Sequence, residues 1–251
     1  MSQPARYTQD MIDEYVAKGL WVDHRPEKLF DRWAERLPQH EAFTDDKTRL
    51  TWSQLKEQSD RLAQALIDLG LGKDEFIVTQ LPNWVELVVL RVAFLKAGIL
   101  TGAAPMTLRH AEMERSLQAL SAVGVAIPSK FRNFDYLDMI QGLRPKLPYL
   151  QHTFIAGDAP PEGTISISRL LENSPVQHGG SLLGKGFSAF EVVAVLFTSG
   201  TTVAPKFSER TAVGARASAI DLVLKGKVTR EDVIGVFCPM SGGPGWMALW
   251  L

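Results

Sequence analysis

Short apolar runs alternate with helix-like stretches along this chain, and this alternation restricts the fold more than any other feature. The apolar runs are bounded by Gly, Pro or Ser and lie at 75–81, 123–129, 152–157, 192–198 and 232–239. Strands that alternate with helices build parallel sheets, because each helix carries the chain back to the start of the next strand. We therefore predict an α/β fold with a mostly parallel sheet flanked by helices.

Two helices are predicted with clear boundaries. Residues 53–70 place one apolar stripe at helical spacing, with Ser53 as the expected N-cap and Gly70 as the stop. The stripe comprises Leu55, Leu62, Leu66 and Leu69. Residues 82–97 are apolar on most sides and end at Gly98, which is typical of a buried helix.

The chain is predicted to divide near residues 177–190, a stretch rich in Gly and Ser that is typical of a linker. Residues 1–176 would form a first lobe, and residues 191–251 would begin a second. The last five residues, "MALWL", are all apolar. Apolar side chains need cover, so we expect this chain to be a piece of something longer.

Charge and cysteine content narrow the functional classes. Lys plus Arg number 27 and Asp plus Glu number 28, so no bulk field favours nucleic acid or an anionic membrane. Cys238 is the single cysteine, which excludes an intrachain disulfide and fits a reducing cytoplasm. The most apolar segment carries Glu86, Arg91 and Lys96, so no membrane span is predicted.

The isolated histidines, the cysteine and the aspartate pair are interpreted as structural residues. The five histidines lack metal-ligand spacing, so no metal site is predicted, and Cys238 is interpreted as a buried structural thiol. Asp45 and Asp46 lie in "TDDKTRLT", which is typical of a hairpin turn ahead of a strand. Because Asp favours turn geometry, a structural role is expected for this pair.

The stretch "TSGTTVAPK" at 198–206 follows a predicted strand, which would deliver it to the carboxyl edge of the sheet, where open α/β sheets bind ligands. A glycine that admits unusual backbone angles, several hydroxyls and one lysine together suit a polyphosphate. These residues are Thr198, Ser199, Gly200, Thr201, Thr202 and Lys206. The pattern GxxxxGK[ST] has no match. On the residues alone, a surface turn whose threonines cap the next helix is an equal alternative.

The same stretch resembles the TSGTTGxPKG signature of the adenylate-forming enzymes, which include acyl-CoA synthetases and aryl acid–AMP ligases. Companion segments occur in the family's order: "LTWSQL" at 50–55, "LKAGILTGAAP" at 95–105 and "CPMSGGPGW" at 238–246. The segments "YVAKGLWVD", "VTQLPNWVEL" and "PKFSERT" are closest in look to the 2,3-dihydroxybenzoate–AMP ligases. The resemblance covers nearly the whole chain and implies the N-terminal portion of the adenylate-forming fold.

The resemblance implies ATP-dependent activation of a small carboxylic acid as an acyl or aryl adenylate, followed by transfer to the thiol of CoA or of a phosphopantetheine carrier protein. Thr198 to Thr202 and Lys206 would hold the β- and γ-phosphates with Mg²⁺ close by. Gly242, Gly243 and Trp246 would line the acid pocket. Family members occur as monomers or homodimers.

The chain departs from the family pattern at several positions. Val203 and Phe207 stand where glycines are usual, Ala212 replaces a histidine, and Gly242–Gly243 replace a His–Asn pair. The family's C-terminal lobe, with its catalytic lysine, is not in this sequence, so no catalytic residue is identified and the 251 residues alone are not expected to turn over. The alternative is a non-catalytic relative that acts as a binding or regulatory module.

Overall fold

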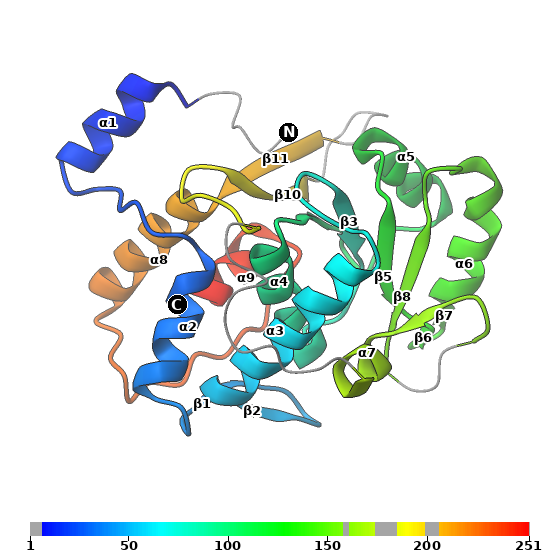
Figure 1. Ribbon diagram of the computed structural model, residues 1–251, viewed down its shortest axis with the longest axis horizontal. Helices are drawn as coiled ribbons and strands as arrows, with labels where there is room; N and C mark the ends of the chain where they lie inside the picture. Colours follow the sequence, from blue (N-terminus) through cyan, green and yellow to red (C-terminus); the bar gives the residue numbers. More distant parts are fainter. Residues whose placement is uncertain (1–6, 158–160, 174–184, 199–205, 251) are drawn as a thin grey trace.

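A single sheet organises the molecule (Figure 1). The computed structural model describes residues 7–157, 161–173, 185–198 and 206–250. Within these ranges a seven-stranded sheet has the order β11-β10-β4-β3-β5-β8-β9, in which only the β10–β11 pair is antiparallel. The strands are β3 (Phe76–Thr79), β4 (Leu100–Ala103), β5 (Gly124–Pro128), β8 (His152–Ala156), β9 (Ile165–Ser166), β10 (Val192–Thr198) and β11 (Lys206–Thr211). The predicted, mostly parallel α/β fold is confirmed.

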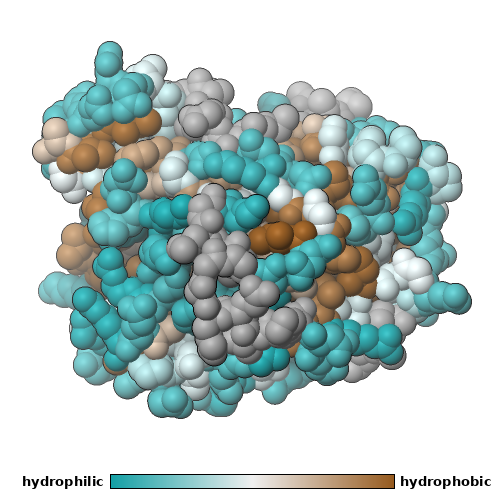
Figure 2. Space-filling model, in the orientation of Figure 1, coloured by the Kyte–Doolittle hydropathy of each residue, from teal (hydrophilic) through white to brown (hydrophobic). Residues whose placement is uncertain are grey.

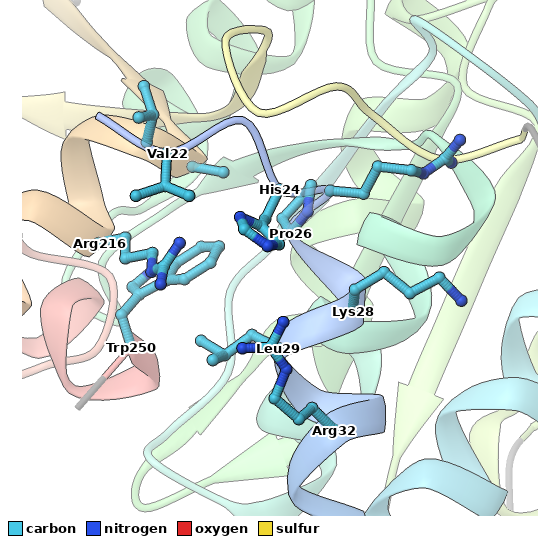
Figure 3. Close-up of a pocket in the computed structure, with 11 residues that line it drawn as sticks. Val22, His24, Pro26, Lys28, Leu29, Arg32, Arg216 and Trp250 are labelled. Atoms are coloured by element: carbon cyan, nitrogen blue, oxygen red, sulfur yellow. The ribbon is translucent and has the colours of Figure 1, made fainter. Parts of the chain in front are cut away.

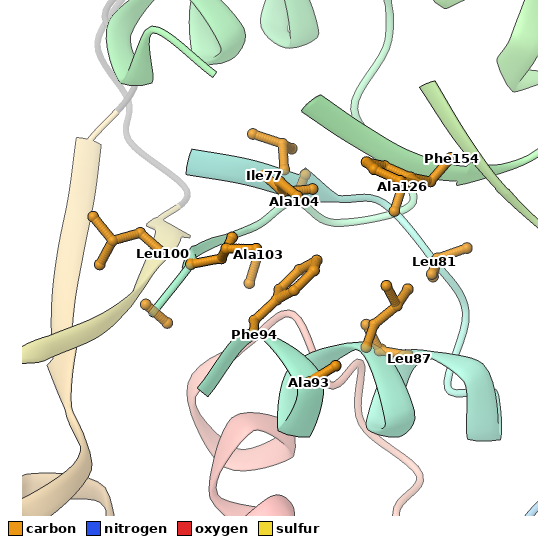
Figure 4. Packing of buried hydrophobic residues seen from close by; sticks show 14 of the residues in the cluster. Ile77, Leu81, Leu87, Ala93, Phe94, Leu100, Ala103, Ala104, Ala126 and Phe154 are labelled. Carbon is orange, nitrogen blue, oxygen red and sulfur yellow. The ribbon is translucent and has the colours of Figure 1, made fainter. Parts of the chain in front are cut away.

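Helices cover both faces of this sheet. α4 (Val85–Ala97) lies against one face (Figure 4), and α5 (His110–Leu120) covers the other, because the crossover from β4 to β5 runs in the opposite direction to that from β3 to β4. The helices are α1 (Gln9–Ala17), α2 (Glu27–Arg36), α3 (Trp52–Asp68), α4 (Val85–Ala97), α5 (His110–Leu120), α6 (Tyr136–Leu143), α7 (Ile167–Asn173), α8 (Ala212–Gly226) and α9 (Gly243–Met247). Short 3-10 turns, η1 (Arg144–Lys146) and η2 (Ala248–Trp250), and two small hairpins complete the fold. The hairpins are β1 (Glu41–Thr44) with β2 (Arg49–Thr51), and β6 (Lys130–Phe131) with β7 (Phe134–Asp135).

α4 is the central buried helix. Every residue of the helix except Glu86 is buried, and Leu87 and Phe94 pack under the strands that carry Ile77 and Ala103 (Figure 4). Gly98 ends the helix at φ +78°, and a Cβ there would lie 2.4 Å from the carbonyl oxygen of Lys185. A left-handed turn under this close approach requires glycine.

α3 begins earlier than the sequence indicated. Its N-cap is Thr51, whose Oγ1 accepts from the amide of Gln54, while Gln54 Oε1 accepts from the amide of Thr51. This reciprocal capping box satisfies two otherwise unpaired donors, which a cap at Ser53 would not do, so the predicted Ser53 cap is wrong. The predicted apolar stripe is buried apart from Leu69, which lies at the exposed C-cap.

The predicted strand at 232–239 is wrong. These residues form no strand, and Val233 and Phe237 are 93% and 99% exposed. An apolar run forms a strand only where a neighbouring strand pairs with it, and no strand among the described residues pairs with this segment.

The predicted boundary at 177–190 does not separate two sheets. β10 follows it and pairs in parallel with β4, so strands from both sides share one sheet. Residues 177–184 lie outside the described ranges, whereas Phe187 and Ala189 are buried. The division into two lobes stays a prediction. Across the ranges given above, no helix has the length and apolar character to cross a bilayer. Hydrophilic residues cover most of the face shown in Figure 2, and apolar residues form smaller patches among them.

Candidate functional site at the carboxyl edge of the sheet

The strand order reverses beside β3. β4 follows β3 on one side, and β5 then returns to its other side. Loops at the carboxyl ends of strands flanking such a switch point form the usual ligand crevice of open α/β sheets. Gln80 links two of these loops, because its Nε2 donates to the carbonyls of Pro105 (2.9 Å) and Leu108 (3.1 Å).

The hydroxyl-rich loop starts and ends at this same edge. β10 runs parallel to β4, and Thr198 at its end pairs with Lys206 at the start of β11. The two residues that flank 199–205 therefore both lie at the carboxyl edge. Ser199, Gly200, Thr201 and Thr202 lie outside the described residues, as does the side chain of Thr198, and Lys206 is exposed.

The alternative in which these threonines cap the next helix is wrong. β11 separates the loop from α8, which begins at Ala212. The N-cap of α8 is Thr211, whose Oγ1 accepts from the amide of Gly214 at 3.2 Å. The capping task belongs to a residue beyond the loop.

A side-chain clamp holds the segment that carries the predicted acid-pocket glycines. Asn83, in the loop after β3, donates from Nδ2 to the carbonyls of Cys238 (2.9 Å) and Val236 (3.3 Å). Its Oδ1 accepts from the amide of Met240 at 2.9 Å. We name residues 236–246 the GGPG segment. Cys238, predicted to be buried, is only half-buried there.

Arg91 reaches the GGPG segment from the middle of α4. It is 1% exposed, and its Nη2 donates to the carbonyl of Met240 at 2.9 Å. Its guanidinium carbon lies 4.8 Å from the centroid of the Trp246 ring, within cation–π range. Burial lowers the pKa of Arg91 to about 9, so the guanidinium is still charged at neutral pH.

Gly242 and Gly243 begin α9. A Cβ on Gly243 would lie 3.9 Å from Nη2 of Arg210, and one on Gly242 would lie 3.5 Å from the carbonyl oxygen of Pro239. Both are ordinary contact distances, and of the two glycines Gly243 is the one that faces the Arg210 guanidinium. Trp246 is 2% exposed and packs on Arg91, so its ring lies in the interior.

Three residues of this region were not predicted as site residues from the sequence. Asn83 and Arg210 occurred there only inside family-like segments, and Arg91 only as a charge in an apolar helix. A buried charge in such a helix signals that a partner exists, but the sequence does not say which.

A separate pocket lies between α2, α8 and η2 (Figure 3). It is open to solvent, and its lining includes His24, Arg32, Arg216 and Trp250. Thr211, which precedes α8, pairs with Val192 at the amino end of β10. This pocket is therefore at the opposite edge of the sheet from the hydroxyl-rich loop.

Potential metal ligands do not gather in the described part of the chain. No group of three or more His, Cys, Asp or Glu side chains is placed to hold a metal ion among those residues. Asp45 has a structural role, since its Oδ2 accepts from the amide of Val85 at the start of α4 (2.9 Å).

Solved structures share this fold. The apo structure of Mycobacterium smegmatis MbtA superposes with a TM-score of 0.83 at 24% identity, covering 98% of this chain and 46% of that one. The anthranilate CoA ligase AuaEII in complex with anthranoyl-AMP gives a TM-score of 0.72 at 20% identity, covering 81% and 38%. The molecule thus has the fold of the N-terminal domain of adenylate-forming enzymes.

The family follows from the sequence comparison. The model of the AMP-binding enzyme family matches residues 30–251, so the chain belongs to that family. A salicylyl-CoA synthase / salicylate adenylyltransferase from Streptomyces sp is 28% identical over 211 residues, which are 82% of this chain and 37% of that protein. The medium-chain fatty-acid–CoA ligase of Escherichia coli (strain K12) is 28% identical over 237 residues, 93% of this chain and 41% of that protein.

The matched relatives are much longer than this chain. The chain spans about two fifths of the length of these curated relatives. The predicted membership of the adenylate-forming ligases is confirmed. The narrower resemblance to 2,3-dihydroxybenzoate–AMP ligases is not confirmed.

Proposed function

We propose that the full-length gene product activates a carboxylic acid with ATP, forming an acyl or aryl adenylate and pyrophosphate, and then transfers the acyl group to a thiol. The observation that carries the proposal is the match of the AMP-binding family over 30–251, within which the hydroxyl-rich stretch connects β10 and β11. The relatives named above are ligases, so the binding or regulatory alternative is not favoured.

The hydroxyl-rich loop is our candidate for the phosphate site. Its two ends are fixed by the β10–β11 hairpin at the carboxyl edge, and Lys206 carries a positive charge exposed to solvent. We propose that Lys206 and the hydroxyls of the loop hold the β- and γ-phosphates, since neutralising phosphate charge is the main electrostatic demand of adenylation. Mg²⁺ would enter with the triphosphate, whose oxygens suit a hard cation.

The GGPG segment is our candidate for one wall of the acid pocket. The carboxylate attacks the α-phosphorus, and its negative charge must approach an anionic phosphate. Arg210, beside Gly243, is a cation that can offset this repulsion. Trp246 would act from behind the wall, because its ring is buried against Arg91.

The acyl group needs an acceptor thiol. We propose CoA as the acceptor thiol, in line with the CoA ligases among the relatives, with a phosphopantetheine carrier protein as the second choice. A cytoplasmic location fits a chain with a single cysteine.

The test is ATP–pyrophosphate exchange by the full-length gene product with aryl, alicyclic and medium-chain fatty acids. We expect exchange with at least one class, followed by thioester formation when CoA is added. An absence of exchange with every acid would remove the enzymatic proposal, whereas exchange without thioester formation would point to a carrier protein as acceptor.

A further inference from the structure

We propose that Asn83 and Arg91 are positioning residues that set the location of the acid-pocket wall relative to the carboxyl edge of the sheet. The inference rests on the proposed function, because it assigns the GGPG segment to the acid pocket. It adds two side chains that would control the affinity for the acid without lying in the pocket.

Asn83 acts as a strand partner for the GGPG segment. Its amide accepts from the amide of Met240 and donates to the carbonyl of Cys238, both at 2.9 Å, which is the pairing that a neighbouring backbone would give. The residue itself is held firmly. It precedes Trp84, whose amide donates to the carbonyl of Pro82 at 2.7 Å, and α4 begins two residues later.

Arg91, near the middle of α4, makes the second attachment. Its Nη2 bonds the carbonyl of Met240, so the amide and the carbonyl of this one residue are held by different side chains. Its Nε and Nη1 have no hydrogen-bond partner among the described residues, and its guanidinium lies over the Trp246 ring. The ring face therefore supplies the attraction that a carboxylate would normally give to this buried charge.

Residues 232–237, which precede the held part of the GGPG segment, are not held in place by burial. Val233 and Phe237 project almost fully into solvent, and residues 232–237 belong to no helix or strand. Met240 is buried, and it is the residue held by both side chains. Gly242 follows two residues later, so a shift at Met240 would move the pocket wall directly.

The first measurement is amide hydrogen exchange on the full-length gene product. Removing the acceptor in Asn83→Ala should speed exchange at Met240 about 10-fold or more, the factor expected from one lost hydrogen bond. Asn133→Ala is the matched control, because Asn133 is exposed in the turn between β6 and β7. Arg91→Met, which keeps the apolar volume and removes the donors, should also loosen residues 240–246.

The second measurement is steady-state kinetics of the full-length gene product. Asn83→Ala and Arg91→Met should raise the KM for the acid about 10-fold and leave the KM for ATP within about 2-fold, since only the acid wall moves. Arg91→Lys, which keeps a charge and a donor, should recover part of the loss. It also serves as the test variant if Arg91→Met does not fold.

The outcomes separate the two proposals. Faster exchange confined to the GGPG segment, with a selective rise in the acid KM, supports the positioning role. Unchanged exchange at Met240, or equal effects on both KM values, overturns it. If the wild type activates no acid, the proposed function fails, and the exchange measurement still decides whether Asn83 and Arg91 hold the segment.

Discussion

Replacing Asp45 by alanine should destabilise the fold through the helix that carries Arg91. Asp45 Oδ2 accepts from the amide of Val85, the first residue of α4, and Oδ1 accepts from the amides of Lys47 (2.9 Å) and Thr48 (2.7 Å). Losing an N-cap costs about 1–2 kcal/mol. The two turn bonds near solvent add roughly 0.5–1 kcal/mol.

The expected loss in the free energy of unfolding is therefore about 1.5–3 kcal/mol, or roughly 3–12 °C in Tm for a chain of this size. Asp45→Asn should lose about half as much, because its amide keeps one acceptor oxygen and presents a donor in place of the other. Urea unfolding of the three proteins at pH 7 measures both differences.

The pH dependence gives an independent check. Partial burial raises the pKa of Asp45, but the bonds from Val85, Lys47 and Thr48 outweigh it and hold the pKa below its ordinary value of 3.8. The contribution is fully present well above pH 3.8 and is lost as the pH falls through the lower folded value. The gap between wild type and Asp45→Ala should therefore narrow in acid.

The matched control is Asp46→Ala, at the exposed neighbouring carboxylate. It should change the free energy of unfolding by less than about 0.5 kcal/mol. If Asp46→Ala costs as much as Asp45→Ala, or if Asp45→Ala is neutral, the capping argument is refuted.

Three further changes test other parts of the molecule. Lys206→Ala should raise the KM for ATP about 10-fold in the full-length gene product and leave urea unfolding nearly unchanged, because the side chain is exposed; an unaltered KM would count against the phosphate site. Gly98→Ala should cost about 2 kcal/mol or more, since it adds a left-handed penalty to a contact with Lys185, whereas Gly70→Ala, with nothing within 4 Å, should cost only the backbone penalty in the same assay. Burial lowers the pKa of His152 below 6.5, so wild type should lose stability relative to His152→Gln between pH 7 and pH 5, and parallel curves would contradict this.

Four of the five predicted strands form, each where an apolar run has a neighbouring strand to pair with, whereas β4, which is buried and pairs on both sides, was not predicted. The runs at 75–81, 123–129, 152–157 and 192–198 contain β3, β5, β8 and β10. The run at 232–239 is also apolar but remains largely exposed. Periodicity measures how apolar a segment is, whereas a strand requires hydrogen bonds from another chain segment, which local sequence does not encode.

The position of the candidate site could be predicted from the sequence, but the strand pairing around it could not. The hydroxyl-rich loop follows a strand, so its position at the carboxyl edge could be inferred from the α/β pattern. That the loop leads into β11, rather than into a helix, depends on the pairing of Thr198 with Lys206, and the sequence left a turn ahead of a helix open.

For the charged residues of α4, the sequence indicates that buried partners exist but does not identify them. Arg91 and Lys96 were visible as charges that exclude a membrane span, and burial physics requires that each finds partners. The structure supplies different ones. Lys96 pairs with Asp60 and with Asp31 (3.3 Å), which tie α4 to α3 and α2, whereas Arg91 holds the GGPG segment.

α4 is therefore attached at three levels: Asp45 at its first residue, Arg91 in the middle and Lys96 near the end. Asn83 stands just ahead of this helix, so the clamp on Met240 inherits its position from attachments to α2, α3 and the β1–β2 hairpin. It follows that Asp45→Ala, which frees the start of α4 beside Asn83, should loosen the GGPG segment more than a loss of the Lys96 pairs at the far end. Hydrogen exchange at Met240 is measured in Asp45→Ala and in a variant that lacks the Lys96 ion pairs, and we expect the faster exchange in Asp45→Ala. Equal exchange rates in the two variants would mean that α4 moves as one rigid body.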